Sequence, residues 1–151
     1  MEVIADKNGE TYRIERFDRQ TGADFKAFLN STKVQKVAIG YANCCFESNR
    51  TLLLADLKIR EDVILVYRRT GLFAEFKTPK RQKRNFQHLG IGTELLKCVI
   101  HFAKAKGLEK VVGKIVDGDY SKNPRLPRWY EQRGFVVTME SATRGQISMT
   151  L

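Results

Sequence analysis

A glycine-rich turn that runs directly into a helical pattern is the first feature of this sequence that could do chemistry. Gly90 and Gly92 are separated by one residue, and apolar residues at helical spacing follow them: Leu95, Leu96, Val99, Phe102 and Ala103. Such a turn aims several backbone N–H groups at one point, with the positive end of the helix dipole behind them. The pattern favours a phosphate or pyrophosphate ligand, although the same turn also occurs as ordinary structure.

A strongly basic stretch lies just before this turn. Residues 77–84, KTPKRQKR, hold five basic side chains, one proline and no apolar residue, which predicts a loop. Such a loop either contacts an anionic ligand or is simply solvated. The whole chain carries a net charge of +10. This charge suits a nucleic acid, an anionic membrane or a polyphosphorylated ligand as partner. It also suits a basic surface that has no specific partner.

Other residue types limit the possible functions. With 151 residues and 42% hydrophobic content, we expect one soluble domain spanning residues 1–151. The absence of a long apolar run and the acidic, polar start argue against a membrane span and a signal peptide. Three cysteines without a C-x-x-C pattern indicate a reducing, cytoplasmic environment. Only two histidines are present, and no cluster has the spacing of metal ligands, so we expect no metal.

The elements that must position the glycine turn alternate between strands and helices. We expect a hairpin in residues 2–17, a short helix in 18–30, and an antiparallel hairpin formed by 34–46 and 51–59. Residues 63–67 and 72–76 suit two short strands or an irregular excursion. The helix that follows the turn should end at Gly107 and lead to a parallel strand in 108–116. A turn-rich segment 117–124, a helix in 125–133 and strands in 135–139 and 146–151 complete an α/β domain with a mixed sheet.

Three segments together resemble the GNAT superfamily of acyl-CoA N-acyltransferases. Residues 87–92, QHLGIG, are similar to its [Arg/Gln]-x-x-Gly-x-[Gly/Ala] signature. Residues 129–135, WYEQRGF, resemble its F/L-Y-E-K-x-G-F segment, with Asn123 seven residues before Tyr130, and residues 54–59 resemble its central strand. The resemblance implies an α+β fold with a mixed, mostly antiparallel sheet, two parallel strands that splay apart, and flanking helices.

The resemblance also implies how acetyl-CoA would bind. The pyrophosphate would lie against the backbone of the signature turn, and the pantetheine arm would pair with the end of the central strand and approach Asn123 and Tyr130. A backbone N–H near Ile59 would polarise the thioester carbonyl. The implied cofactor-binding residues are Leu57, Lys58, Ile59, Gln87, His88, Leu89, Gly90, Ile91, Gly92, Thr93, Asn123 and Tyr130.

For catalysis, the resemblance implies direct transfer of an acetyl group to a primary amine. The amine must lose a proton before it attacks, and Asp56 is the first candidate for the general base, with Glu61 second. Tyr130 holds the position of the general acid that protonates the leaving thiolate. Asp56 can also be a structural carboxylate, Tyr130 can simply pack its ring, and Asn123 can simply cap the following helix.

This sequence departs from the family pattern around residues 60–86, where a basic insertion separates the central strand from the signature. The insertion would contact the 3′-phosphate of CoA or an acidic acceptor. Residues 18–33 hold room for one short helix where the family commonly has two, so the acceptor stays open: a small molecule, a protein amine, or an acidic or RNA-linked amine. A basic nucleic-acid-binding module and a non-catalytic acyl-CoA sensor remain alternatives, and so does a homodimer.

Overall fold

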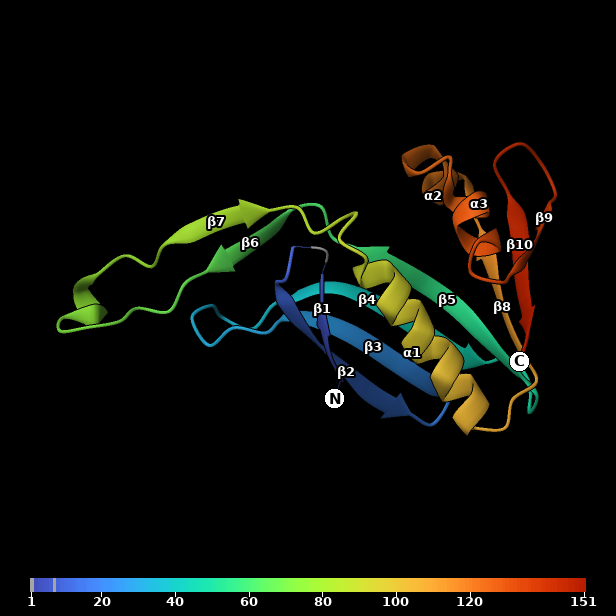
Figure 1. Cartoon of the computed structure of the whole chain (residues 1–151), viewed down its shortest axis with the longest axis horizontal. Coiled ribbons are helices and arrows are strands. Elements are labelled where there is room, and N and C mark those ends of the chain that lie inside the picture. The colour runs from blue at the N-terminus through green and yellow to red at the C-terminus, as the bar shows by residue number, and fades with distance from the viewer. Residues whose placement is uncertain (1, 7) are drawn as a thin grey trace. The chain divides into compact units, whose positions relative to one another are not determined.

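The computed structural model describes residues 2–6 and 8–151, which form ten strands and a few helices. Eight strands make a mixed sheet in the order β1-β2-β3-β4-β5-β8-β10-β9, and β6 and β7 make a separate two-stranded sheet (Figure 1). This sheet confirms the predicted fold class. The strands are β1 (Glu2–Ala5), β2 (Thr11–Arg19), β3 (Gly22–Leu29), β4 (Ala38–Phe46), β5 (Thr51–Ile59), β6 (Val63–Val66), β7 (Arg81–Arg84), β8 (Lys110–Ile115), β9 (Val136–Met139) and β10 (Gly145–Thr150).

The first three strands form a meander. β1 and β2 pair antiparallel from Glu2↔Ile14 to Ala5↔Thr11, as the sequence predicted. The helix predicted in residues 18–30 is wrong, because that segment contains β3. Thr21 and Gly22 form a tight turn rather than a helix start: a Cβ on Gly22 would lie 2.1 Å from the Cys44 carbonyl oxygen, and Phe46 N–H donates to the Thr21 carbonyl. No helix precedes residue 74 in the part of the chain that the structure describes.

Helix α1 (Ile91–Ala105) connects β5 to β8, which pair in parallel as predicted. Its apolar stripe of Leu95, Leu96, Val99, Phe102 and Ala103 is buried, as the helical periodicity indicated. The helix ends at Gly107, whose φ of 68° is left-handed, and Leu108 N–H donates to the Ala103 carbonyl. None of the helices in the described residues is both long and apolar enough to pass through a bilayer.

The C-terminal third contains two short helices and a hairpin. Residues predicted to be turn-rich form helix α2 (Asp117–Lys122), so that prediction is corrected. Helix α3 (Leu126–Glu131) has Pro127 in its first turn and is followed by Gly134 at a left-handed φ of 86°, as predicted. β10 pairs antiparallel with both β8 and β9. The Asp117 carboxylate accepts hydrogen bonds from Arg144 and Thr143 and so joins the start of α2 to the β9–β10 turn.

The insertion is more ordered than the sequence suggested. Residues 63–66 form the predicted strand, but residues 81–84, predicted to be a loop, form β7 and pair with β6 from Val63↔Arg84 to Val66↔Arg81. Residues 74–76 form the short 3-10 turn η1 (Ala74–Phe76), not a strand. β6 supplies the apolar residues of this hairpin, since Val63 and Leu65 are buried, and the pairing makes the basic segment a strand. We call residues 63–84 the arm.

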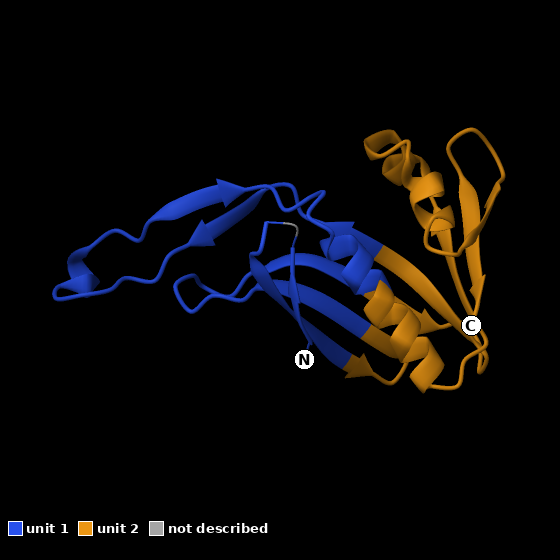
Figure 2. Ribbon diagram, viewed as in Figure 1, with its two compact units in different colours: residues 1–17, 24–42, 57–96 blue, residues 18–23, 43–56, 97–151 orange. Residues whose placement is uncertain are grey.

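The chain divides into two compact units, coloured blue and orange in Figure 2. Unit 1 contains residues 1–17, 24–42 and 57–96, and unit 2 contains residues 18–23, 43–56 and 97–151. In unit 1, the Leu95 side chain of α1 lies over Gly40 of β4. In unit 2, Phe102 of α1 stacks on Phe46 of β4, with 6.2 Å between ring centroids and 24° between ring planes.

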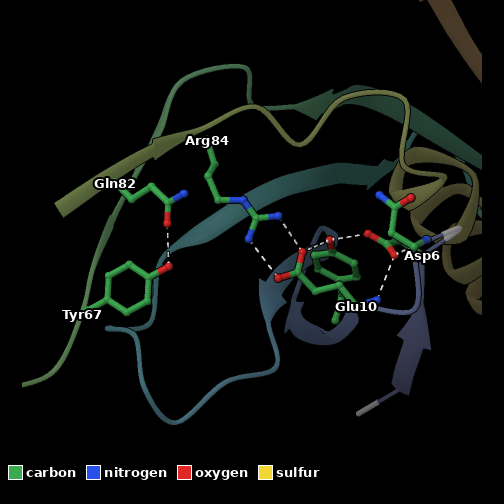
Figure 3. A network of polar contacts seen from close by, with 7 residues as sticks. Asp6, Glu10, Tyr67, Gln82 and Arg84 are labelled. Carbon is green, nitrogen blue, oxygen red and sulfur yellow. Dashed lines mark hydrogen bonds and ion pairs between the residues drawn. The ribbon is translucent and has the colours of Figure 1, made fainter. Parts of the chain in front are cut away.

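A bidentate ion pair anchors the arm within unit 1. Both terminal nitrogens of Arg84 donate to the Glu10 carboxylate at 2.9 and 2.7 Å, as Figure 3 shows. The Tyr12 hydroxyl lies 2.7 Å from one oxygen of Glu10 and 2.7 Å from one oxygen of Asp6. The Tyr12 ring is fully buried against Phe86. Hydrogen bonding from Arg84, followed by Tyr12, holds the pKa of Glu10 below its ordinary value, even though partial burial opposes this shift.

We predict that Glu10→Gln lowers the free energy of unfolding by about 1 kcal/mol at pH 7, because it removes a bidentate charged contact that is mostly shielded. The folded-state pKa of Glu10 lies below its ordinary value of 4.5, so its contribution is full above that pH and is lost as the pH falls through the folded pKa. Urea unfolding at pH 7 and pH 3 measures this. Glu47→Gln, at an exposed turn, is the control. An equal loss at both pH values would contradict the assignment.

Candidate functional site

The turn before α1 contains two residues with left-handed backbone. His88 and Gly90 both adopt left-handed φ angles, 60° and 91°. Thr93 N–H donates to the Gly90 carbonyl at 2.9 Å, which closes the first turn of α1. The N–H groups at the start of a helix have no acceptor within the helix, so this turn presents donors to a ligand. The Ile91 side chain is buried, and therefore only its backbone is available.

Gly90 is required for its conformation and not for close packing. A Cβ built on Gly90 would meet no atom within 4 Å, but its φ of 91° disfavours any L-residue with a side chain. The open space above Gly90 means that a ligand can approach this backbone closely. The same position would be blocked by a large side chain.

The Gln87 side chain links the beginning of the signature turn to Glu61, two residues after β5. Its Nε2 donates to the Glu61 carboxylate at 2.9 Å, while Gln87 N–H donates to the Asn85 side chain at 2.8 Å. The structure therefore brings together Glu61 and Gln87, which were predicted for different roles. Glu61 acts here as the hydrogen-bond acceptor that orients Gln87.

The backbone of β5 changes its hydrogen-bonding phase in the middle of the strand. Near its start, the Thr51 carbonyl accepts from Glu47 N–H, so odd-numbered residues face β4. Just beyond its end, Arg60 N–H donates to the Ile39 carbonyl of β4, so even-numbered residues face β4 there. The burial alternation also breaks, because Ala55 and Asp56 are both exposed. These observations place a β-bulge at Ala55–Asp56.

This bulge turns the end of β5 into an unpaired edge. The parallel pairing with β8 runs from Thr51↔Lys110 to Leu54↔Gly113 and ends there. Past the bulge, Arg60 N–H points towards β4, and backbone groups alternate between the two edges of a strand, so those of Leu57 and Ile59 point away from β4. The Ile59 side chain packs over Gly40, and the Lys58 side chain is exposed. Leu57 and Ile59 thus carry donors and acceptors that an extended ligand can pair with.

Tyr130 lies in an aromatic cluster in unit 2. Its side chain is 7% exposed, and its ring meets Trp129 at 4.9 Å and Phe135 at 5.5 Å, both edge to face. The turn at Gly134 makes this possible, since Phe135 N–H returns to the Tyr130 carbonyl at 3.2 Å. Among the residues that the structure describes, none forms a hydrogen bond with the Tyr130 hydroxyl. The phenol is held by packing and keeps its proton available for a ligand.

Burial raises the pKa of Tyr130 well above its ordinary value, and the negative charges of Asp119 and Asp56 raise it further. The phenol therefore stays protonated throughout the physiological pH range. Asp56, a predicted catalytic residue, interacts electrostatically with Tyr130 within unit 2. The sequence did not indicate Asp119 as part of this site, because segment 117–124 is expected to be a turn-rich connection, whereas it forms helix α2.

Asn123 connects α2 to α3. Its N–H donates to the Asp119 carbonyl, and its side-chain oxygen accepts from Arg125 N–H at 3.2 Å. This is a local turn just before α3, whose N-cap residue Arg125 has no side-chain cap hydrogen bond, so both roles considered for Asn123 stay predictions. Within the described residues there is no group of three or more metal-binding side chains. A shallow hollow lined by Phe46, Ser48, Asn49, Lys106 and Leu108 contains none of the predicted site residues.

Comparison of the sequence with models of known families identifies the family of this chain. The family model for acetyltransferases of the GNAT type matches residues 3–135. The chain belongs to the acetyltransferase (GNAT) family. Members of this family use acetyl-CoA, and both the signature turn and Tyr130 lie within the matched residues. No match to this chain was found among curated proteins.

Solved structures with the same fold include several acetyltransferases. A GNAT family acetyltransferase from Elizabethkingia anophelis with acetyl-CoA bound is 18% identical, with a TM-score of 0.61, over 93% of this chain and 98% of that one. Nourseothricin acetyltransferase is 16% identical, with a TM-score of 0.56, over 99% and 82%. Arabidopsis thaliana Naa50 in complex with the bisubstrate analogue CoA-Ac-MVNAL is 16% identical, with a TM-score of 0.52, over 85% and 72%.

We predict that Gly90→Ala lowers the melting temperature by several degrees, because a left-handed φ costs about 1–2 kcal/mol for a residue with a Cβ. Gly90→Asn should lose less, since asparagine tolerates this conformation better. Thermal unfolding followed by circular dichroism measures both. Gly118→Ala is the matched control, because Gly118 lies in α2 with open space and no left-handed φ. If Gly90→Ala melts like the wild type, the turn does not depend on its left-handed residue.

Proposed function

We propose that this protein transfers an acetyl group from acetyl-CoA directly to a primary amine. The observation that carries the proposal is the turn at residues 87–93, where a left-handed Gly90 opens α1 at the acyl-CoA signature of the family. In a chain outside this family, the same turn would indicate a phosphate-containing ligand but not acetyl-CoA in particular.

The cofactor would use backbone groups more than side chains. The pyrophosphate of acetyl-CoA would accept hydrogen bonds from the N–H groups of His88, Leu89, Gly90, Ile91 and Gly92, with the dipole of α1 behind them. The N–H groups of Gln87 and Thr93 flank this set and already donate to Asn85 and to the Gly90 carbonyl. The amide groups of the pantetheine arm pair with the outward-facing backbone of Leu57 and Ile59. Ile59 N–H is then the nearest candidate donor to the thioester oxygen.

The reaction itself requires two proton transfers. The deprotonated amine nitrogen attacks the thioester carbonyl carbon and forms the new C–N bond, the C–S bond breaks, and CoA leaves as a thiolate. The attacking amine gives up one proton to a base, and the sulfur gains one. The products are the N-acetylated acceptor and CoA with its thiol restored.

Tyr130 is suited to stabilise the leaving thiolate by hydrogen bonding. Its raised pKa keeps the phenol protonated, but complete transfer of the proton would leave a phenolate near Asp56 and Asp119. A thiol of ordinary pKa near 8.5 is a stronger acid than this phenol, so the equilibrium favours a donated hydrogen bond and a final proton from water. We therefore assign Tyr130 as the donor to the developing negative charge on sulfur.

Asp56 is the better candidate for the base. It is exposed at the β5 bulge and interacts electrostatically with Tyr130, whereas the Glu61 carboxylate already accepts from Gln87. Glu61 is then a positioning residue for the signature turn. The acceptor would be an amine on a small molecule or a protein. The cysteines are thiols and not disulfides, which favours the reducing cytoplasm as the location.

We predict that thiol release from acetyl-CoA depends on an added amine, and that Tyr130→Phe lowers kcat by roughly 10²-fold or more. The affinity for acetyl-CoA should change little, because the ring remains in its aromatic cluster. A thiol-release assay across a panel of amines, with calorimetric titration of acetyl-CoA, measures both quantities. Tyr120→Phe, a second tyrosine of unit 2, is the control.

Two outcomes would contradict parts of this proposal. Binding of acetyl-CoA without amine-dependent thiol release from any acceptor would indicate a sensor. Full activity of Tyr130→Phe would remove the phenol from the mechanism while leaving the acetyltransferase activity in place.

We predict a different division of effects for the two carboxylates. Asp56→Asn should lower kcat, with little change in acetyl-CoA binding, because an asparagine side chain cannot accept the proton of the amine. Glu61→Gln should instead weaken acetyl-CoA binding, with a smaller change in kcat, because it alters the hydrogen bond that orients Gln87. Steady-state kinetics over a pH range separate the two. The opposite pattern would make Glu61 the base.

A further inference from the structure

The tip of the arm exposes three large apolar side chains. Leu72 is 85% exposed, Phe73 is 70% exposed and Phe76 is 80% exposed. The two phenylalanine rings lie next to each other, with 6.5 Å between their centroids and 46° between their planes. Large exposed apolar side chains that cluster in this way commonly mark a binding surface.

The tip has a defined structure that presents these rings. Arg69 donates to the Glu75 carbonyl at 2.7 Å and so closes the loop from 69 to 75. Phe73 has a left-handed φ of 61°, which is strained for an aromatic residue. Strain of this kind is found mainly where a local conformation serves a function.

The arm is also the most basic part of the chain. Residues 68–84 contain one acidic residue, Glu75, and seven basic residues: Arg68, Arg69, Lys77, Lys80, Arg81, Lys83 and Arg84. In the described part of the chain, Arg68, Lys77 and Arg81 make no ion pair and are exposed. Their charge is available to an anionic partner.

The two faces of the arm have different roles. Arg84 lies on the face that holds the arm in place, since it binds Glu10, and Gln82 shares that face and accepts a hydrogen bond from Tyr67 within the arm (Figure 3). Arg81 and Lys83 point to the opposite face, because side chains alternate along β7. Cations two residues apart on a strand are separated by about 7 Å, which is comparable to the extended spacing of phosphates along a single strand.

We propose that the arm binds single-stranded nucleic acid. Bases stack on Phe73 and Phe76 at the tip, and phosphates contact the cations that extend along the arm. The distribution of charge favours this partner over an anionic membrane. The six steps from Lys77 to Lys83 can span up to about 20 Å, whereas a headgroup layer is only about 5–8 Å thick. None of the residues named here is among those proposed for acetyl transfer, and the proposal does not rest on that activity.

Fluorescence anisotropy of a labelled twelve-nucleotide oligouridine with the full chain tests the proposal. The double variant Phe73→Ala, Phe76→Ala should bind at least tenfold more weakly, because each stacked base loses its aromatic partner. Both rings are exposed, so the variant should keep the wild-type melting temperature. Val136→Ala, which truncates another exposed apolar residue, is the matched control and should bind like the wild type.

The salt dependence tests the charged part of the surface. The double variant Lys77→Glu, Arg81→Glu should reduce the slope of log affinity against log salt by about 1.4, as expected for two lost phosphate contacts on a single strand. Lys104→Glu with Lys110→Glu, two exposed lysines of unit 2, should leave the slope unchanged.

Three results would overturn the proposal. The first is sedimentation with phosphatidylserine vesicles that requires Leu72 and both phenylalanines, without binding of oligouridine. The second is equal competition by polyglutamate with no effect of the phenylalanine variant, which would indicate a general polyanion surface. The third is equal affinity of the wild type for single-stranded oligouridine and for a duplex that contains the same strand. Bases paired in a duplex are not free to stack on Phe73 and Phe76, so this result would exclude base stacking.

Discussion

The change of hydrogen-bonding phase in β5 is the constraint on which the proposed chemistry depends. A strand within a regular sheet uses its backbone groups on both edges, and no groups remain for a ligand. The bulge at Ala55–Asp56 interrupts that pattern at the point where pairing with β8 ends. One extra residue therefore makes two changes together: it exposes Asp56, and it orients Leu57 and Ile59 for an extended partner.

Backbone strain fixes the turn before α1, and burial fixes the Tyr130 side chain. The left-handed residues His88 and Gly90 order the start of α1 before any ligand is present, so that less conformational entropy is lost on binding. Tyr130 is fixed by its aromatic neighbours and not by a hydrogen bond of its hydroxyl within the described residues. In the proposed mechanism, cofactor binding and proton donation would therefore depend on different kinds of interaction: backbone conformation at the turn and side-chain packing around Tyr130.

The sequence was most informative where one local signal determines the structure. The stripe of α1, the stop at Gly107 and the turn at Gly134 all follow from periodicity or from a glycine conformation, and the structure confirms them. Long-range pairing was harder to predict. Thr21 and Gly22 suggested a helix start, but the approach of the Cys44 carbonyl to Gly22 shows a hairpin turn. The basic segment 81–84 becomes a strand only because β6 pairs with it. The bulge was not predicted either, because residue types do not show which edge of a strand each backbone N–H group faces.

The arm begins and ends at adjacent points of the fold. Val63 pairs with Arg84, and Phe86 N–H donates to the Arg60 carbonyl at 3.3 Å, so the chain leaves β5 and returns towards α1 almost where it left. A gene can therefore gain, lose or exchange this segment in one event without changing the strand order of the main sheet. In evolutionary terms, the arm is a segment that could be exchanged independently of the main sheet.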